Sequence, residues 1–217
     1  MLTILTLKIL LMIVYLSHWD WNLYKSRKDI VLNLDDLNFT AICPEGKYTN
    51  ELSSIYEDWI NWEIERKKTF DIKGIINLKN ILNSLEEDAI VHSFTLRTGI
   101  LYSISNLFLK NNQKGVLSIN GLGYLFSNNL KAKLLKFLLS TFIKISFNKN
   151  FREIIFQNKS DQKTFLKYSK YSGKTSLIEG SGIEINNYIK KETYQLKKLK
   201  VIFVSRLLID KGVHEYI

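Results

Sequence analysis

A chain of 217 residues is long enough for one α/β domain of ordinary size and a remainder, and its composition (46% hydrophobic, 24% charged) excludes a disordered protein. The single cysteine, Cys43, excludes an intrachain disulfide and fits a reducing cytoplasm. The net charge of +10 is concentrated in residues 89–152, which contain nine Lys and Arg and no Asp or Glu. This one-sided charge favours an anionic partner, meaning phosphate groups, nucleic acid or an acidic membrane face, with solvated lysines as the alternative.

The first sixteen residues are apolar apart from Lys8 and two threonines. A membrane-spanning helix needs roughly 20 apolar residues, and Ser17, His18 and Asp20 end this run earlier. A signal peptide carries its positive charge before the apolar core and a small-residue cleavage site after it, and this run has neither. We therefore expect a buried parallel strand at Ile9–Leu16, with a membrane or signal segment as the alternative.

Apolar, β-rich runs alternate with helical patterns along the whole chain. The predicted strands are Ile9–Leu16, Phe39–Cys43, Ile60–Ile64, Ala89–His92, Val116–Ile119, Ile154–Gln157, Ser176–Ile178 and Val201–Val204. The predicted helices are Tyr24–Leu34, Tyr48–Tyr56, Lys73–Leu85, Leu101–Lys110, Leu130–Phe147 and Ser160–Lys167. This alternation predicts an α/β fold with a Rossmann-like, open and mostly parallel sheet that has helices on both faces.

Ligands of such sheets bind beyond the carboxyl ends of the strands. That rule selects residues by position alone, namely Ser17, His18, Pro44, Glu45, His92 to Thr95, Asn120 to Gly123, and Asn158. A histidine at a strand end can hydrogen-bond a substrate hydroxyl, and a structural histidine is the alternative. The loop containing Asn120, Gly121 and Gly123 gives close backbone access to a phosphate or sugar, or is an ordinary turn. No metal site is expected.

The longest helical pattern, Leu130–Phe147, combines apolar residues at helical spacing with interspersed lysines. It predicts either a core helix with a basic outer face or a helix on an anionic membrane surface.

The sharpest motif lies near the end of the chain. A predicted strand, Val201–Val204, is followed by Arg206 and, after four residues, by Lys211 and Gly212. Two cations at the carboxyl end of a strand can neutralise the diphosphate leaving group of a nucleotide sugar, and an exposed loop with two cations is the alternative.

This motif resembles the opening of the donor domain in family 4 glycosyltransferases, which are retaining enzymes with two Rossmann-like domains (GT-B). Further segments match the N-terminal domain of that family in order and spacing, especially bacterial members that extend polyprenyl-diphosphate-linked saccharides or build surface polysaccharides. They are Leu16–His18, Leu23–Arg27, Ile90–Thr95, Asn120–Tyr124, Ile155–Asn158 and Gly180–Glu184. The glycine pair and the paired glutamates of many family members are missing.

The resemblance implies an acceptor-side domain at 1–185, a linker at 186–199 and the start of a donor-binding domain at 200–217. It assigns the donor diphosphate to Arg206, Lys211 and Gly212, and a catalytic role to His92. The acceptor or phosphate loops would contain Ser17, His18, Arg27, Thr95, Asn120, Gly121 and Gly123, with an exposed Arg27 as the alternative. The substrates would be a nucleotide sugar, with uridine diphosphate as the expected carrier, and a polyprenyl-diphosphate-linked saccharide, without a cofactor or metal.

A protein of this kind is expected in the cytoplasm, peripheral at the inner face of the cell membrane. Nucleic acid is not an expected partner, whereas a separately encoded donor domain is. Because the glutamate-bearing segment is missing, we expect the chain alone to lack appreciable transferase activity. The alternatives are a basic α/β module that binds anionic lipid or nucleic acid, and a nonfunctional gene remnant.

Overall fold

The computed structural model describes residues 11–34, 36–66, 68, 71–107, 109, 115–122, 130–187, 201–205, 207 and 212–217, and only the backbone of 130–139. The chain divides into two compact units, Met1–Ile183 and Glu184–Ile217. The first unit contains the sheet and its helices. The second contains a 3-10 turn (Ile185–Asn187) and α7 (Val213–Tyr216).

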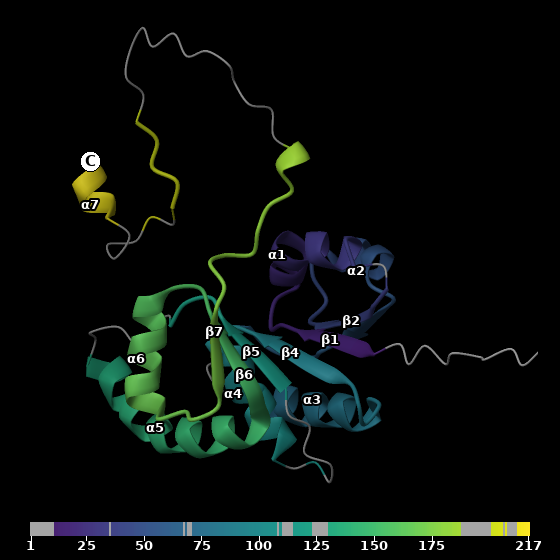
Figure 1. The fold of residues 1–217 in the computed structure, drawn as a ribbon, viewed down its shortest axis with the longest axis horizontal. Coiled ribbons are helices and arrows are strands. Elements are labelled where there is room, and N and C mark those ends of the chain that lie inside the picture. Colours follow the sequence, from purple (N-terminus) through teal and green to yellow (C-terminus); the bar gives the residue numbers. More distant parts are fainter. Residues whose placement is uncertain are drawn as a thin grey trace, which may run out of the picture. The chain divides into compact units, whose positions relative to one another are not determined.

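The first unit is built on a seven-stranded sheet in which every pairing is parallel, in the order β3-β2-β1-β4-β5-β6-β7 (Figure 1). The strands are β1 (Met12–Leu16), β2 (Asn38–Cys43), β3 (Asp58–Asn61), β4 (Ile90–Phe94), β5 (Gly115–Ile119), β6 (Phe151–Phe156) and β7 (Lys174–Leu177). Parallel pairing requires a crossover between consecutive strands, and the helices supply these crossovers.

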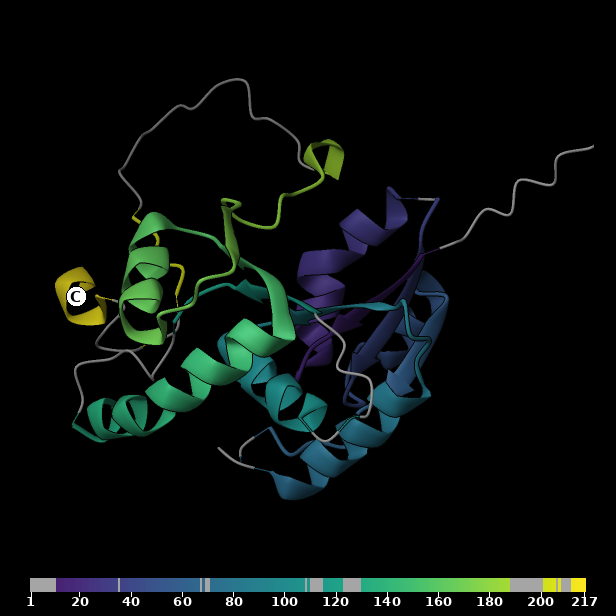
Figure 2. The same ribbon diagram turned by 60° about the horizontal axis from the view of Figure 1, so that its bottom comes forward.

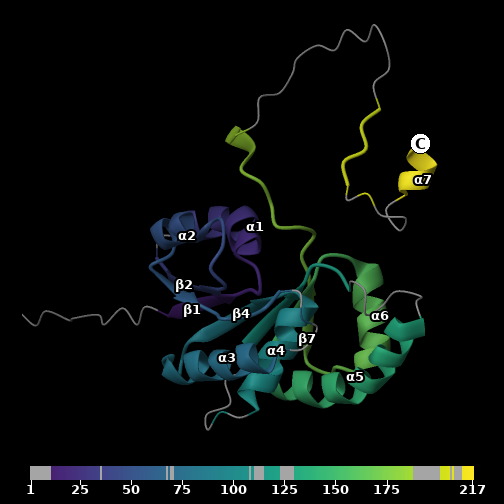
Figure 3. The same ribbon diagram turned by 180° about the vertical axis from the view of Figure 1, so that it is seen from behind.

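The helices cover both faces of the sheet. On one face lie α1 (Asp20–Leu32) and α2 (Thr49–Ile55), next to each other. The opposite face is covered by a row comprising α3 (Ile72–Ser84), α4 (Leu96–Asn106), α5 (Leu130–Asn150) and α6 (Lys159–Ser169). Figure 2 brings this row forward, and Figure 3 shows the two layers from behind. The predicted Rossmann-like α/β fold is therefore confirmed.

Side chains that alternate along the central strands form two cores. Val14 and Leu16 of β1 belong to the core under α3 to α6, whereas Tyr15 belongs to the core under α1 and α2. A strand with helices on both sides is expected to be apolar on both faces, and β1 fits this rule. On the face toward α1, polar side chains occur at Ser118 of β5 and at Gln157, directly after β6.

Three helices of the first unit begin at side-chain caps, and one of them is α4, where the Thr95 side chain accepts from the Thr98 amide. The Asp71 carboxylate accepts a hydrogen bond from the Gly74 amide at the start of α3. At the start of α6, Asn158 Oδ1 accepts one from the Asp161 amide at 2.8 Å. Such caps satisfy backbone donors that have no partner inside the helix.

Two predicted strands differ from the structure. The third was expected at Ile60–Ile64, but β3 ends at Asn61 because the chain turns there to bury Trp62, whose Nε1 donates to the Gly74 carbonyl at 2.8 Å. The strand predicted at Val201–Val204 is wrong, since the described residues of the second unit contain no strand. There Val201, Ile202 and Val204 are 66%, 78% and 89% exposed. A β-rich run without a neighbouring strand has no ladder to join.

Candidate functional site

The order of strands reverses between β1 and β4, because the chain passes outward from β1 to β3 and then returns to the other side of β1. Ser17 directly follows β1 and Thr95 directly follows β4, so both turns lie at this reversal. Open α/β sheets bind their ligands in the crevice at such a point. The fold therefore has, between β1 and β4, the feature at which a ligand-binding site is expected.

A crevice of about 200 Å³ opens on the α1 side of the sheet, next to the reversal. Residues of α1, β1, β4, β5 and β6 line it, together with the segment that follows β7. Its polar lining side chains are Arg27, His92, Ser118, Asn120, Gln157 and Ser181. The described part of this lining contains no Asp or Glu. Three residues selected from the sequence, Arg27, His92 and Asn120, are thus brought together.

Among the residues that the structure describes, Arg27 is the only charged side chain that lines the crevice. The residue is 7% exposed, which excludes the alternative of an exposed helix arginine. Its guanidinium carbon lies 4.2 Å from the centre of the Phe94 ring, a cation–π contact. The Nε atom is buried and has no hydrogen-bond partner among the described residues. Burial lowers the pKa of Arg27, while the nearby Tyr15 and Tyr56 act in the opposite direction.

His92 lies beside Arg27 in the same crevice, and its Nε2 atom is 2.8 Å from Ser118 Oγ. Its pKa is lowered to about 3, first by burial and then by the Arg27 charge, against a smaller upward effect of Glu153. The imidazole is therefore neutral near pH 7 and offers one donor and one acceptor nitrogen. A neutral imidazole can orient a hydroxyl group without adding charge to the site.

Asn120 extends the polar lining at the carboxyl end of β5. Its Oδ1 atom is buried and finds no hydrogen-bond partner in the described part of the chain. Such an atom is expected to be satisfied by water or by a ligand, because an unpaired buried acceptor is unfavourable. The amide of Gln157, which follows β6, lines the same crevice.

His18 forms a second polar cluster at the reversal. Its Nδ1 atom lies 2.9 Å from Thr98 Oγ1 and 3.3 Å from Thr95 Oγ1. The pKa of His18 is lowered to about 4 by burial and then by the charges of Arg97 and Arg66. Thr95 adopts a φ of +79°, a conformation that non-glycine residues rarely take, and strain of this kind often lies at functional sites. The cluster is consequently polar and uncharged at His18.

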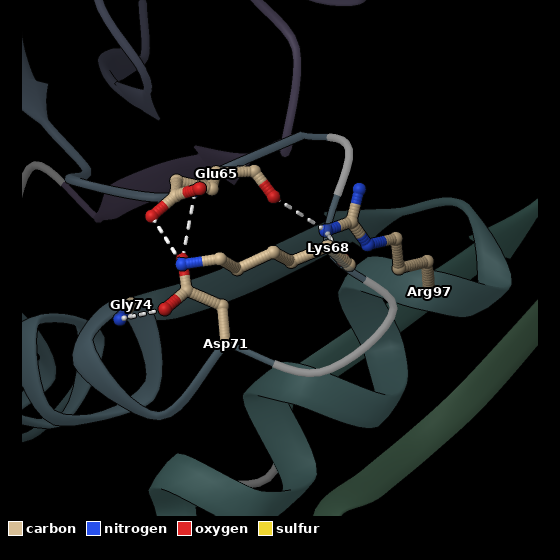
Figure 4. Close-up of polar contacts among 5 residues, drawn as sticks. All are labelled: Glu65, Lys68, Asp71, Gly74 and Arg97. Atoms are coloured by element: carbon tan, nitrogen blue, oxygen red, sulfur yellow. Dashed lines mark hydrogen bonds and ion pairs between the residues drawn. The ribbon is translucent and has the colours of Figure 1, made fainter.

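Arg97 fixes the loop that faces this second cluster (Figure 4). Its guanidinium donates to the carbonyls of Arg66, Glu65 and Lys68 at 2.7, 3.0 and 2.6 Å. Asp71 holds the same loop by accepting from the Glu65 amide at 2.8 Å. The loop in turn carries Arg66, whose guanidinium carbon lies 4.1 Å from the centre of a Trp19 ring.

The remaining predicted site residues have different surroundings. Ser17 is fully buried and its Oγ atom closes the turn by donating to the Trp19 carbonyl at 3.1 Å, which is a structural contact. Gly121 is exposed, and a Cβ atom added there would meet no atom within 4 Å. Gly212 belongs to the second unit, where it precedes α7 with a φ of +79°. Gly123, Arg206 and Lys211 lie outside the described residues, so their roles stay predictions.

Sequence reasoning assigned no site role to several polar side chains of both clusters, although two of them lie in the family-like segments. They are Arg66, Thr98, Ser118, Gln157 and Ser181. Thr98 had a local signal, because it lies three residues after Thr95 at the start of α4. Ser118 had none, since a serine inside an apolar strand shows its direction only once the strand is packed.

Other chemistries find little support among the described residues. No cluster of three or more His, Cys, Asp or Glu side chains suited to a metal ion occurs in that part of the chain. Cys43 is fully buried, and burial raises its pKa to about 12, so its thiol is not a nucleophile near pH 7.

The described part of the chain contains no helix of the length and apolarity needed to cross a membrane.

The long helix α5 packs on the sheet along its second half. Ile143 and Phe147 are buried in the core, whereas Lys144 and Lys149 are exposed. This arrangement favours the prediction of a core helix with a basic outer face. Lys131, Lys133 and Lys136 lie where the structure describes only the backbone.

No protein-family model matches this sequence, and no curated protein matches it. Among solved structures, the UDP-N-acetylglucosamine 2-epimerase from Rickettsia bellii is similar to this chain, with a TM-score of 0.49 and 10% sequence identity. The similarity covers 77% of this chain and 44% of the epimerase chain, so this chain spans less than half of that protein's length. A similarity of this extent assigns no activity to the chain.

Proposed function

We propose that the first unit is the acceptor-side domain of a retaining, nucleotide-sugar-dependent glycosyltransferase of family 4. The observation that carries this proposal is the crevice at the strand-order reversal, where amides, hydroxyls and a neutral imidazole surround one buried cation. Uncharged donors and acceptors suit sugar hydroxyls, and the cation suits a phosphate group. The order and spacing of the family-like segments support the same conclusion.

In this proposal the acceptor is a polyprenyl-diphosphate-linked saccharide and the donor is a uridine-diphosphate sugar. His92 orients the acceptor hydroxyl, and Asn120 holds a neighbouring polar group of the sugar. Arg206 and Lys211, with Gly212, bind the donor diphosphate and stabilise the negative charge that grows on it as the glycosidic bond to the leaving group breaks. Retaining transfer of this type does not need the paired carboxylates of a retaining glycosidase.

The test is a sugar-transfer assay with radiolabelled uridine-diphosphate sugars and membrane lipid acceptors. The 217-residue chain is assayed alone and with a donor domain from a family 4 enzyme, since a separately encoded donor domain is a proposed partner. His92→Gln should lower kcat, and Arg206→Ala or Lys211→Ala should raise the KM for the donor. His214→Gln, at an exposed histidine of α7, is the matched control. Absence of transfer under every condition would refute the proposal.

We further propose that the protein associates peripherally with the inner face of the cell membrane through the lysines of α5. Because Ile143 and Phe147 are buried, the contact would be electrostatic, with about 1 kcal/mol from each lysine near an anionic surface. The double change Lys144→Glu/Lys149→Glu should then weaken binding to phosphatidylserine vesicles. Lys73→Glu/Lys79→Glu on α3 provides the control with the same change in charge. An equal loss of vesicle binding in both variants would contradict a specific contact through α5, because it would show that only the net charge determines binding.

The second candidate function is a basic module that binds nucleic acid, and the acid-free stretch 89–152 is the observation that favours it. Such binding would be independent of sequence and strongly salt-dependent. Salt-sensitive binding to arbitrary RNA with affinity equal to that for lipid-linked saccharides would support the module over the transferase.

A further inference from the structure

We propose that the crevice beside α1 is a phosphate-binding site in which Arg27 is the anchoring cation for a diphosphate group. The choice of a diphosphate, rather than another anion, rests on the proposed function. The assignment of an anion site does not, because it follows from the surroundings of Arg27 alone.

The first argument is that Arg27 is a buried cation without a counter-ion in the part of the chain that the structure describes. It is 7% exposed, and no hydrogen bond or ion pair joins it to any other residue that the structure describes. The groups whose charge would raise the pKa of Arg27 are the phenols of Tyr15 and Tyr56, and burial keeps both phenols protonated. Buried charges in folded proteins are normally paired, because an unpaired one is costly. An anion bound in the crevice would supply the missing pair.

The second argument is the contrast with Arg97. Both arginines lie at the strand-order reversal, but Arg97 donates three hydrogen bonds to backbone carbonyls and thereby holds a loop. Arg27 contacts the Phe94 ring and otherwise faces the crevice that it lines. A structural arginine uses its donors inside the protein, whereas Arg27 leaves its donors available for a ligand.

The third argument is the composition of the lining. Asn120, Gln157 and Ser181 offer amide and hydroxyl donors, and none of the described lining residues is a carboxylate that would repel an anion. Glu153 is the acidic residue whose charge raises the pKa of His92. Its carboxylate already forms an ion pair with Lys174 Nζ at 2.9 Å and accepts a hydrogen bond from the Ser176 hydroxyl. Gly180 has a φ of +88° and open space where a Cβ atom would stand, so ligand atoms can approach its backbone.

The volume of the crevice limits the size of the ligand group that it can hold. The crevice holds about 200 Å³, whereas pockets for drug-sized ligands usually hold about 300–1,000 Å³. It suits a phosphate or diphosphate group with the rest of the molecule outside. That group can belong to a lipid diphosphate or to a nucleoside diphosphate, and the experiment has to separate these sources.

The test is titration of the full chain with inorganic diphosphate by isothermal calorimetry. Saturable binding is expected, and Arg27→Met should weaken it by about 10- to 100-fold, as expected for the loss of a charged hydrogen-bond donor. Lys25→Met, which removes one exposed charge from the same helix, should change the dissociation constant less than about twofold. No binding by the wild-type chain, or equal effects of the two variants, would overturn the proposal.

Two further measurements keep the test decisive. The side-chain Nε–H resonance of Arg27, in arginine-labelled wild-type protein, should shift on titration even if Arg27→Met does not fold, and an unchanged resonance would overturn the proposal. Arg27→Lys keeps the charge but loses the two-pronged guanidinium, so it should bind more weakly than wild type. Equal binding by Arg27→Lys would contradict a guanidinium-specific contact.

Parallel titrations with a short-chain prenyl diphosphate and with uridine diphosphate identify the source of the group. Tighter binding of the prenyl compound assigns the crevice to the acceptor, and tighter binding of uridine diphosphate assigns it to the donor. Arg27-dependent diphosphate binding without sugar transfer would refute the proposed function and leave the anion site standing. Sugar transfer by Arg27→Met with unchanged KM values for both the donor and the acceptor would refute the anion site and leave the proposed function standing.

Discussion

Changing Arg27 and Arg97 separately to Met should have opposite effects on the free energy of unfolding. Arg27→Met loses a cation–π contact with Phe94, worth about 0.5–2 kcal/mol. It also removes an unpaired buried charge, and apolar replacement of buried charges is often neutral or stabilising by about 1–4 kcal/mol. Taking the middle of each range, the gain exceeds the loss, and the variant should be about 1 kcal/mol more stable than wild type.

Arg97→Met loses three hydrogen bonds to loop carbonyls. Hydrogen bonds from a charged donor contribute about 1.5–3 kcal/mol each when buried, but these carbonyls can be rehydrated, so the expected total loss is about 1–3 kcal/mol. Urea unfolding followed by tryptophan fluorescence measures both values. A loss of more than about 1 kcal/mol in Arg27→Met would refute the reasoning that Arg27 is uncompensated. A neutral Arg97→Met would refute its assignment as the residue that holds the loop.

Three further predictions concern buried groups. Unfolding free energy should rise from pH 5 to 7, because His18 and His92 have folded pKa values of about 4 and about 3 and the unfolded chain protonates them below about 6.5. Each of the two histidines increases the unfolding free energy by up to about 1.4 kcal/mol per pH unit in this range. Changing both histidines to Gln should remove most of this pH dependence. Gly115→Ala should destabilise by about 1–3 kcal/mol in urea unfolding, since its Cβ atom would lie 2.6 Å from the Val91 carbonyl oxygen, whereas Gly121→Ala should be neutral. The Cys43 thiol should react with a thiol reagent only after unfolding, because it is buried and its pKa is raised to about 12.

The sheet could be predicted because local patterns agree with the global fold there. Five-residue apolar runs such as Met12–Leu16 are too short for a helix, and the helical patterns between them leave parallel crossovers as the simple solution. The same rule was wrong at Val201–Val204, where the composition is as β-rich but no strand is present among the described residues of that unit. A strand depends on its neighbours, and a local pattern does not contain them.

The candidate site could be predicted only in part. The rule that ligands bind at strand ends correctly indicated that His18 and Thr95 lie at one edge, and the structure places them 3.3 Å apart. It could not show that Arg97 organises the facing loop, because the acceptors are backbone carbonyls that no sequence pattern marks. It also left open whether Arg27 is exposed, since the direction of a helix residue depends on how the helix is rotated against the sheet.

The burial of Arg27 illustrates where local and global rules conflict. The buried side of α1 contains the polar residues Asp20, Asn22 and Arg27 as well as Leu23 and Val31, so apolar periodicity alone does not identify that side. Asp20 has a structural reason to be buried, because it accepts a hydrogen bond from the Tyr48 amide at 3.0 Å. Arg27 has no such partner among the described residues, and an apolar side chain would fill its position at lower cost. A sequence that keeps a less stable choice at one position of an otherwise consistent fold is best explained by a ligand that compensates the charge.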